Sequence, residues 1–185
     1  MKNICFFVGN LNATGGTERV TALIANALAD SEGCKIFIIS LTGEGKSFFN
    51  LSEKVVVSGL YDENFSFKLH FLSIIKKIRN FIKQNKIDTL ITVESILCIV
   101  SIPAVCFLNI KHICWEHFNF NVNLGVKLRD VARRWAAKYC DYIVTLTHRD
   151  QQLWKNNLSN IRSEIITIVN PSTFEGIEHI PDLDF

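Results

Sequence analysis

Residues 4–19 read ICFFVGNLNATGGTER. The apolar run 4–8 is typical of a strand that a parallel sheet buries on both faces. After the loop 9–14 and two glycines, a helix is predicted over 17–30, with apolar residues at helical spacing. Glycines leave backbone N–H groups bare, and the first turn of a helix adds unpaired donors and a positive dipole end. The stretch predicts a strand-loop-helix unit whose backbone can approach a phosphate, although a plain tight turn explains the same residues.

The rest of the chain repeats this alternation. Further strands are predicted over 35–41, 55–58, 89–93, 112–116, 142–146 and 165–169, and further helices over 67–83, 95–108, 126–139 and 149–156. Most of these strands are continuous apolar runs. The pattern therefore predicts an α/β fold with a doubly wound, Rossmann-like parallel sheet of about seven strands. In such sheets ligands bind beyond the carboxyl ends of the strands.

The composition suits one globular domain and excludes several classes of protein. The chain has 185 residues, of which 48% are hydrophobic and 21% are charged. A net charge of +2 is too small to indicate a nucleic-acid partner. Two helices carry basic residues beside an apolar stripe, which predicts solvated outer faces, with attraction to anionic lipid headgroups as the alternative. These residues are Lys76, Lys77, Arg79, Lys83 and Lys86, and Lys127, Arg129, Arg133, Arg134 and Lys138.

Six cysteines occur in apolar strand or helix contexts, with no C-x-x-C pair and no His/Cys group at metal spacing along the chain. They predict buried thiols in a reducing cytoplasm and no metal site. The N-terminal apolar run is too short for a secretory signal, so a cytoplasmic location is expected. The apolar stretch 95–110 is shorter than a membrane span and predicts a buried helix.

Two nucleotide-binding motifs are rejected. Residues 42–47 (TGEGKS) end like a P-loop, but Ser40 stands where its first glycine belongs and no helix pattern follows. The G-x-G-x-x-G fingerprint of Rossmann oxidoreductases is absent from the first loop, and no acidic residue ends the second strand. A nucleotide triphosphatase and an oxidoreductase are therefore both disfavoured.

Polar side chains follow three of the predicted strands, where a ligand of such a sheet is expected. The candidates are Glu94, Ser95, Glu116, His117, Asn119, Thr147 and Arg149. Each has a structural interpretation as well. A lone histidine is more often structural than catalytic, and Thr147 with Asp150 forms a plausible helix N-terminus.

Four segments in this order and spacing resemble the N-terminal half of a GT-B fold, family 4 retaining glycosyltransferase. They are 15–18 (GGTE), 115–118 (WEHF), 141–147 (DYIVTLT) and 168–171 (IVNP), and the resemblance extends from Met1 to about Ser172. It implies that Gly15, Gly16 and Thr17 lie against the donor diphosphate and sugar. It also implies that His117 acts near the transferred sugar. Glu18 is a second catalytic candidate, although a favourable charge at the helix N-terminus explains it equally well.

The resemblance implies transfer of a sugar from a nucleotide-sugar donor to a hydroxyl acceptor, with retention of configuration. The acceptor is expected to be a glycan or a lipid-linked molecule, as in cell-surface polysaccharide synthesis, with peripheral contact to the inner face of the membrane as one interpretation. No metal and no cofactor are expected, because the nucleotide-sugar is a substrate.

Residues 1–172 are expected to form the acceptor-side domain, and 173–185 the start of an interdomain linker or a tail. The C-terminal nucleotide-binding domain of the family is absent, so the chain is interpreted as a fragment that is inactive alone. The alternative is a non-catalytic α/β module that binds a sugar or nucleotide, or one subunit of a two-chain transferase.

Overall fold

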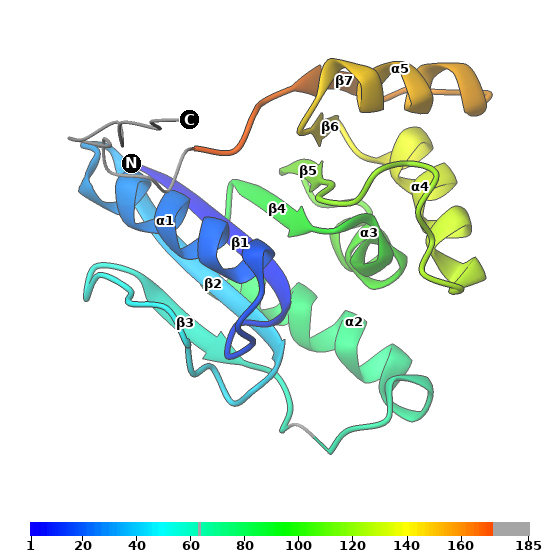
Figure 1. Ribbon diagram of the computed structural model, residues 1–185. Coiled ribbons are helices and arrows are strands. Elements are labelled where there is room, and N and C mark those ends of the chain that lie inside the picture. Colours follow the sequence, from blue (N-terminus) through cyan, green and yellow to red (C-terminus); the bar gives the residue numbers. More distant parts are fainter. Residues whose placement is uncertain (63, 172–185) are drawn as a thin grey trace, which may run out of the picture.

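Seven parallel strands form one sheet with helices on both sides in the computed structural model, which describes residues 1–62 and 64–171 (Figure 1). The strands are β1 (Lys2–Asn10), β2 (Cys34–Thr42), β3 (Val56–Gly59), β4 (Thr89–Val93), β5 (Lys111–Trp115), β6 (Tyr142–Thr145) and β7 (Glu164–Thr167). The helices are α1 (Gly16–Asp30), α2 (Phe67–Gln84), the short 3₁₀ helix η1 (Ser95–Leu97), α3 (Cys98–Val105), α4 (Lys127–Tyr139) and α5 (His148–Asn157).

The strand order β3-β2-β1-β4-β5-β6-β7 confirms a doubly wound sheet. The chain winds outward from β1 in one direction through β2 and β3, and then returns to β1 and winds in the other direction from β4. Ile4 of β1 accordingly pairs with Ile36 on one side and with Thr89 on the other. The reversal falls between β1 and β4, and this switch point is where sheets of this type bind ligands.

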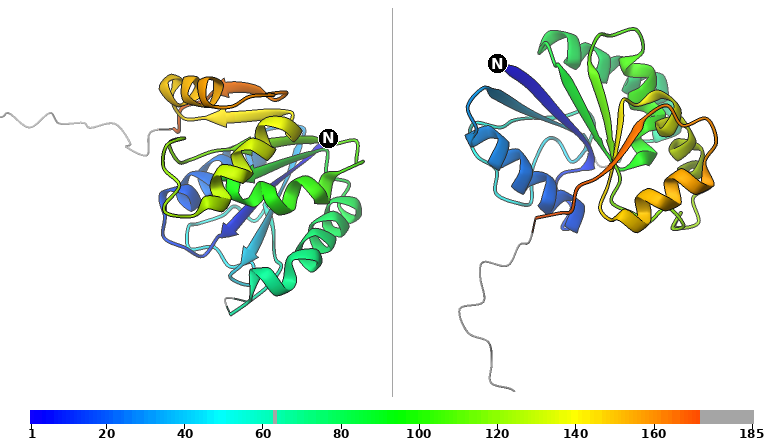
Figure 2. Two further views of the ribbon diagram at one scale, coloured as in Figure 1. Left: turned by 90° about the vertical axis from the view of Figure 1, so that its right-hand side faces the viewer. Right: turned by 90° about the horizontal axis from the view of Figure 1, so that it is seen from above.

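The two faces of the sheet are covered unequally. Because successive strand residues point to opposite faces, Cys5 and Phe7 pack with α2 and α3, whereas Phe6 and Val8 pack with α1. Beyond β4 the first of these faces continues under α4 and α5, where Trp154 is fully buried. Figure 2, seen from above, shows α1 on one side of the twisted sheet and α3 and α4 on the other.

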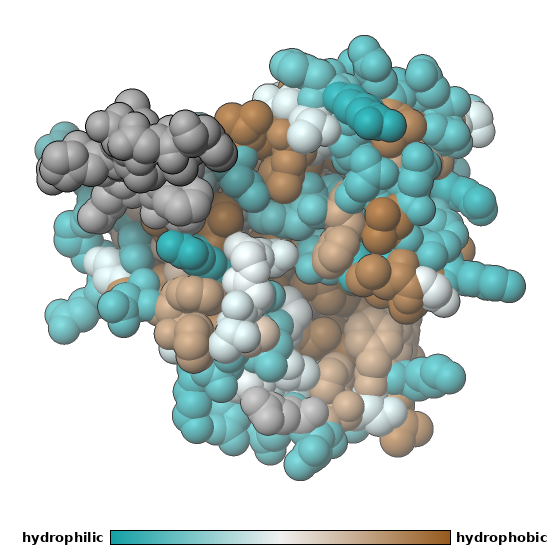
Figure 3. Space-filling view, viewed as in Figure 1, coloured by the Kyte–Doolittle hydropathy of each residue, from teal (hydrophilic) through white to brown (hydrophobic). Residues whose placement is uncertain are grey.

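On the α1 side, β4, β5 and β6 leave an apolar groove of about 180 Å³. Figure 3 shows hydrophobic residues in a hollow near the centre of this face. The groove is lined by Phe6, Ile24, Ile91, Ile113, Trp115, Val144 and Ile168. It lies between α1 and the segment that follows β7, because Ile24 belongs to α1 and Ile168 comes directly after β7.

The single helix predicted over 95–108 is wrong in detail. Residues 95–97 form the 3₁₀ turn η1, and α3 ends at Val105 because Cys106 is extended and Phe107 adopts a left-handed φ of 61°. Pro103 lies inside α3. Residues 173–185, expected as the start of an interdomain linker or a tail, lie outside the described residues, as does Ser172 at the predicted end of the domain.

Residues 43–45 form a tight turn that confirms the rejection of a P-loop. Gly43, Glu44 and Gly45 all have positive φ, and no helix follows until α2. A side chain on Gly45 would lie 2.7 Å from the backbone nitrogen of Gly59 in β3. The glycines therefore serve the close approach of two backbone segments.

The prediction that all six cysteines are buried is wrong for two of them. Cys5, Cys98, Cys114 and Cys140 are buried, but Cys34 is half-buried and Cys106 is exposed. All six are free thiols.

Candidate functional site

A small cavity of about 90 Å³ lies at the switch point between β1 and β4. The end of β1 contributes Gly9, the first turn of α1 contributes Thr17 and Glu18, and the end of β4 contributes Glu94. The sequence predicts ligand binding here from the carboxyl ends of the strands, and the structure places four polar or glycine positions around one cavity. Two carboxylates at its wall favour neutral, hydroxyl-rich groups over a bare anion.

The glycine loop leaves the first turn of α1 without a side-chain cap. Gly15 is the N-cap residue and has no side chain to cap the helix, and within residues 1–62 and 64–171 no side chain replaces that cap. The Glu18 carboxylate folds back over Gly15, where an added Cβ would collide with it, whereas an added Cβ on Gly16 would meet nothing within 4 Å. Glu18 therefore lies at the positive end of the helix dipole, next to donors that a ligand can use.

Glu94 follows β4 in a strained backbone conformation. Its φ of 74° belongs to the left-handed region that residues other than glycine rarely adopt, and such strain concentrates at functional sites. Burial raises the pKa of its carboxyl group, and the nearby Arg129 guanidinium opposes the rise. Glu94 Oε2 accepts a hydrogen bond of 3.1 Å from Arg129 Nη2.

Arg129 holds two buried nitrogens with no partner among the described residues. Its guanidinium lies 4.4 Å from the centre of the Phe118 ring, and only Nη2 bonds to Glu94. The Nε and Nη1 atoms are buried and unpaired. Buried polar groups are normally hydrogen-bonded, so these two donors mark a place where a polar or anionic ligand group, or water, belongs.

Arg133, one helical turn further along α4, is by contrast fully engaged. It pairs with Glu116 at 3.5 Å and donates to the carbonyl oxygens of Phe120 at 2.6 Å and Val122 at 2.8 Å. The prediction of a solvated basic face on this helix is therefore wrong for Arg129 and Arg133, which are both buried. The burial of Arg129 and Arg133 was not expected from the sequence, because charged residues are normally placed on the outer face of a helix. In the structure both arginines share the inward face of α4 with Ala132 and Ala136.

Glu116 and Ser95, predicted at the rim, lie beneath it. Both are buried, and the Ser95 hydroxyl donates to Glu116. Glu116 also accepts a hydrogen bond of 3.1 Å from the backbone of Phe118. Burial raises the pKa of the Glu116 carboxyl, while the Ser95 hydroxyl and the Arg133 guanidinium lower it. This network fixes the loop after β5 and thereby sets the position of His117.

His117 follows Glu116 in the loop after β5. Its ring contacts the Trp115 ring with centroids 4.4 Å apart and the ring planes inclined by 54°. Burial lowers the pKa of His117 to about 4, so the imidazole is neutral near pH 7. Its Nε2 atom is buried without a partner among the described residues. A neutral ring with one unused nitrogen is suited to a hydrogen bond with a ligand.

A second cavity of about 180 Å³ brings together the residues that follow β5 and β6. His117 and Asn119 line one side, and Thr147 and Asp150 line the other. Thr147 caps α5 as predicted, since its hydroxyl accepts from the backbone N–H of Asp150 at 3.1 Å. Arg149 is exposed and is not among the residues that line this cavity.

A further cavity, of about 450 Å³, was missed by the sequence interpretation. It is lined by Asn12, Gly43, Glu44, Lys46, Asp62 and Asn64. These residues come from the loop after β1, the turn after β2 and the segment before α2. The rejected P-loop segment thus belongs to a polar hollow at the same edge of the sheet. The feature of the sequence that could have indicated this cavity is the cluster of turn residues directly after a predicted strand.

Solved structures of similar fold are enzymes that act on sugars. A lipopolysaccharide outer core galactosyltransferase WaaB has 16% identity and a TM-score of 0.65, with 94% of this chain and 47% of that chain covered. A sucrose-phosphate synthase from Thermosynechococcus elongatus has 10% identity and a TM-score of 0.69, with 91% and 48% covered. A UDP-GlcNAc 2-epimerase from Neisseria meningitidis, bound to UDP-GlcNAc, has 12% identity and a TM-score of 0.61, with 92% and 47% covered. At these identities the likeness shows the fold, which is a Rossmann-like half of the GT-B type.

The family follows from sequence. The model of Glycosyltransferase Family 4 matches residues 14–171. An uncharacterized glycosyltransferase from Haemophilus influenzae is 40% identical over 173 residues, which are 94% of this chain and 48% of that protein. The chain belongs to glycosyltransferase family 4, as its motifs led us to expect. It spans about half the length of the curated relative it matches.

Proposed function

We propose that the chain forms the acceptor-side half of an enzyme that transfers a sugar from a nucleotide-sugar to a hydroxyl acceptor, with retention and without an obligatory metal. The observation that carries the proposal is the neutral His117 of a family 4 domain, which lies in the loop after β5 and whose buried Nε2 has no partner among the described residues. In this reaction the leaving diphosphate gains negative charge while the sugar gains positive charge. Groups that stabilise each developing charge are therefore needed on both sides of the breaking bond.

The charges around the switch point suggest a division of labour. Glu18 and Glu94 repel a diphosphate but accept hydrogen bonds from sugar hydroxyls, so we assign them to the transferred sugar or the acceptor. The N–H groups at Gly15 and Gly16 and the free donors of Arg129 suit phosphate oxygens. His117 Nε2 either orients the sugar or accepts a hydrogen bond as positive charge develops on the sugar.

The test is the variant His117→Ala in the full-length enzyme, compared with Asn119→Ala at the exposed rim of the same cavity. Turnover should fall by roughly the 10²- to 10⁴-fold typical of a group that acts in the transition state. Affinity for the nucleoside diphosphate, measured by calorimetry, should stay nearly unchanged, since the proposal assigns the nucleotide to the other half. Strong loss of nucleotide affinity with turnover intact at saturating donor would refute the assignment, provided circular dichroism shows a folded variant.

Activity of the 185-residue chain alone separates this proposal from its alternative. A chain that holds only one half of the active-site cleft should give no product detectable by mass spectrometry with a panel of nucleotide-sugars. Robust turnover by the purified chain would contradict the two-domain interpretation. A non-catalytic module would instead bind a nucleotide-sugar or a glycan tightly by itself, and no downstream domain would be needed for that binding.

The outer face of α4 supports a lipid-linked acceptor. Leu128, Val131, Trp135 and Tyr139 lie at helical spacing, and each is between 37% and 52% exposed. Lys127, Arg134 and Lys138 are exposed on the same helix. Exposed aromatic and aliphatic residues with basic neighbours favour binding to the surface of an anionic membrane. In residues 1–62 and 64–171 no helix has the length and apolar character needed to cross a bilayer.

Vesicle flotation tests this surface. The full-length protein should float with vesicles containing phosphatidylglycerol and should not float with pure phosphatidylcholine. Trp135→Glu together with Arg134→Glu should abolish flotation, and the matched change Leu69→Glu on the exposed face of α2 should leave it intact. Equal flotation of both variants would assign the membrane contact elsewhere.

A further inference from the structure

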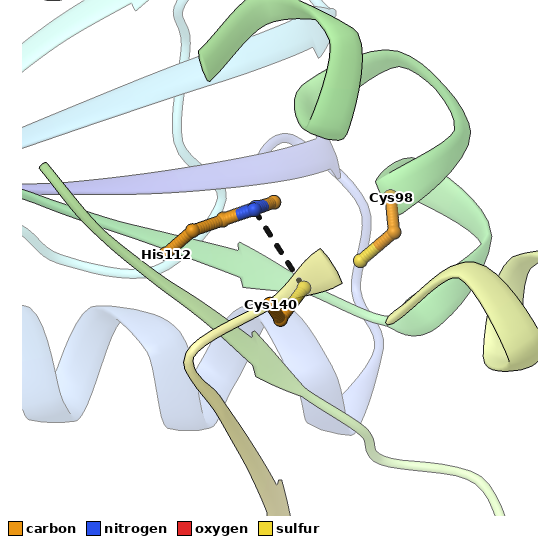
Figure 4. A group of neighbouring side chains, drawn as sticks. All are labelled: Cys98, His112 and Cys140. Carbon is orange, nitrogen blue, oxygen red and sulfur yellow. Dashed lines mark hydrogen bonds between the residues drawn. The ribbon is translucent and has the colours of Figure 1, made fainter. Parts of the chain in front are cut away.

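Three potential metal ligands meet on the α3–α4 side of the sheet. Cys98 opens α3, His112 is the second residue of β5, and Cys140 is the C-cap of α4. Their ligand atoms all lie within 4.8 Å of one another, and all three residues are buried (Figure 4). His112 Nδ1 lies 3.6 Å from Cys140 Sγ. These residues are far apart along the chain and match no metal-binding motif of short spacing.

The far side of the His112 ring is already held in place. Nε2 lies 2.9 Å from Thr92 Oγ1 and 3.1 Å from Ser101 Oγ. The Thr92 hydroxyl donates its own proton to Ser101 at 2.9 Å, so Thr92 Oγ1 is available to accept from Nε2–H. That tautomer leaves the Nδ1 lone pair directed toward the cysteines. Metal-binding histidines are commonly oriented in this way by a hydrogen bond at the other nitrogen.

A further sulfur lies beside the group. Cys114, two residues after His112 on the same face of β5, packs in the same buried cluster as Cys98 and Cys140, although its sulfur is not one of the ligand atoms that lie within 4.8 Å of one another. The geometry therefore offers two buried sulfurs and one imidazole nitrogen to a single metal ion, with a further sulfur in the same cluster.

We propose that Cys98, His112 and Cys140, completed by Cys114, bind one Zn²⁺ ion in a closed structural site. Sulfur and imidazole ligands in a tetrahedral set are the preference of zinc, and structural zinc sites have no open position. Deprotonation of the Cys98 and Cys140 thiols, with a neutral His112, balances the charge of Zn²⁺. The Cys114 thiolate, as fourth ligand, completes the coordination number and gives the Cys₃His site a net charge of −1. The site ties α3, β5 and the end of α4 together. It is independent of the transfer reaction and lies outside the cavities at the carboxyl edge.

The test begins with the unmodified chain, purified under reducing conditions without chelator. Elemental analysis should find about one zinc per chain, and exchange with Co²⁺ should produce a thiolate-to-cobalt charge-transfer band. Removing the metal with a chelator should lower the melting temperature, and adding Zn²⁺ should restore it. A chain that contains no zinc and gives no charge-transfer band with Co²⁺ would overturn the proposal.

Two variants locate the metal. Cys98→Ser should reduce bound zinc at least tenfold, whereas Cys5→Ser, a matched change at a buried thiol outside the group, should leave the zinc content unchanged. Equal zinc content in both variants would place the metal elsewhere and refute the site. Titration of thiols in the denatured, unreduced chain gives a further check. Fewer than six reactive thiols in metal-free protein would indicate a disulfide in place of the zinc site.

Discussion

Two glutamate-arginine pairs connect the loops beyond the sheet to α4, and they differ in completeness. Glu116 and Arg133 are both almost inaccessible, and Arg133 also bonds to backbone carbonyls. Glu94 and Arg129 are paired at 3.1 Å, yet Arg129 keeps two unused donors and Glu94 has a left-handed backbone. The same residue types thus form a fully hydrogen-bonded structural pair, Glu116–Arg133, and one helical turn away a pair with unused donors, Glu94–Arg129, that can still bind a ligand.

The largest effect should come from breaking the closed pair. Arg133→Met leaves Glu116 buried without its charge partner, which should lower the free energy of unfolding by roughly 3–5 kcal/mol. The change is measured by urea denaturation of the chain. The neighbouring exposed Arg134→Met is the control and should shift the stability by less than about 0.5 kcal/mol. Similar small losses in both variants would mean that Arg133 is not the support described here.

The half-buried His117 extends the comparison to pH. The pKa of His117 in the folded protein, about 4, is below its ordinary value of 6.5, so the unfolded chain takes up the proton first as the pH falls. Stability is therefore present above pH 6.5 and is lost between pH 6.5 and 4.

Substitution of His117 isolates its share of this pH dependence. Between pH 7 and pH 5 the wild-type chain should lose about 2 kcal/mol more stability than His117→Gln, as follows from the two pKa values by linkage. Denaturant titrations at the two pH values measure the difference. If both proteins lost the same stability, His117 would not be held neutral by burial.

Opening the incomplete pair should affect function more than stability. Arg129→Met removes a guanidinium with unused donors, and the half-accessible Glu94 can then be neutralised by a proton. We expect a loss of about 1 kcal/mol in stability and a fall of about tenfold or more in kcat/KM of the full-length enzyme. Stability loss as large as that of Arg133→Met, with kcat/KM unchanged, would erase the distinction between the two pairs.

The smallest effects should distinguish the two glycines of the loop. Gly16→Ala adds a methyl group in open space at the start of α1 and should stabilise the chain by up to about 1 kcal/mol. Gly15→Ala removes a favoured N-cap residue and displaces the Glu18 carboxylate, so it should be destabilising. Thermal melts give both signs. Full transferase activity of Gly16→Val in the complete enzyme would argue against a diphosphate lying on this backbone.

The fold was predictable because it depends on local periodicity. Continuous apolar runs alternating with helical patterns identified all seven strands, whereas the switch point between β1 and β4 became known only from the strand order in the structure. The site was less predictable, because the presence of a charged residue in the sequence does not show whether its side chain points into the protein or toward solvent. Arg129 and Arg133 have the same letters and spacing as solvated neighbours, and only the packing of α4 against the loop after β5 turns them inward. The Cys98–His112–Cys140 group was invisible for a related reason, since its members come from three elements.

The central position of β1 has a consequence for the chain during synthesis. Its first neighbour, β2, follows within the same short unit, but its second neighbour pairs Ile4 with Thr89 and cannot form until β4 has left the ribosome. Until then this apolar central strand presents an open edge of unpaired N–H and C=O groups. Nascent chains that stall before β4 should therefore be the aggregation-prone species of this protein, and holding chaperones should act in that interval.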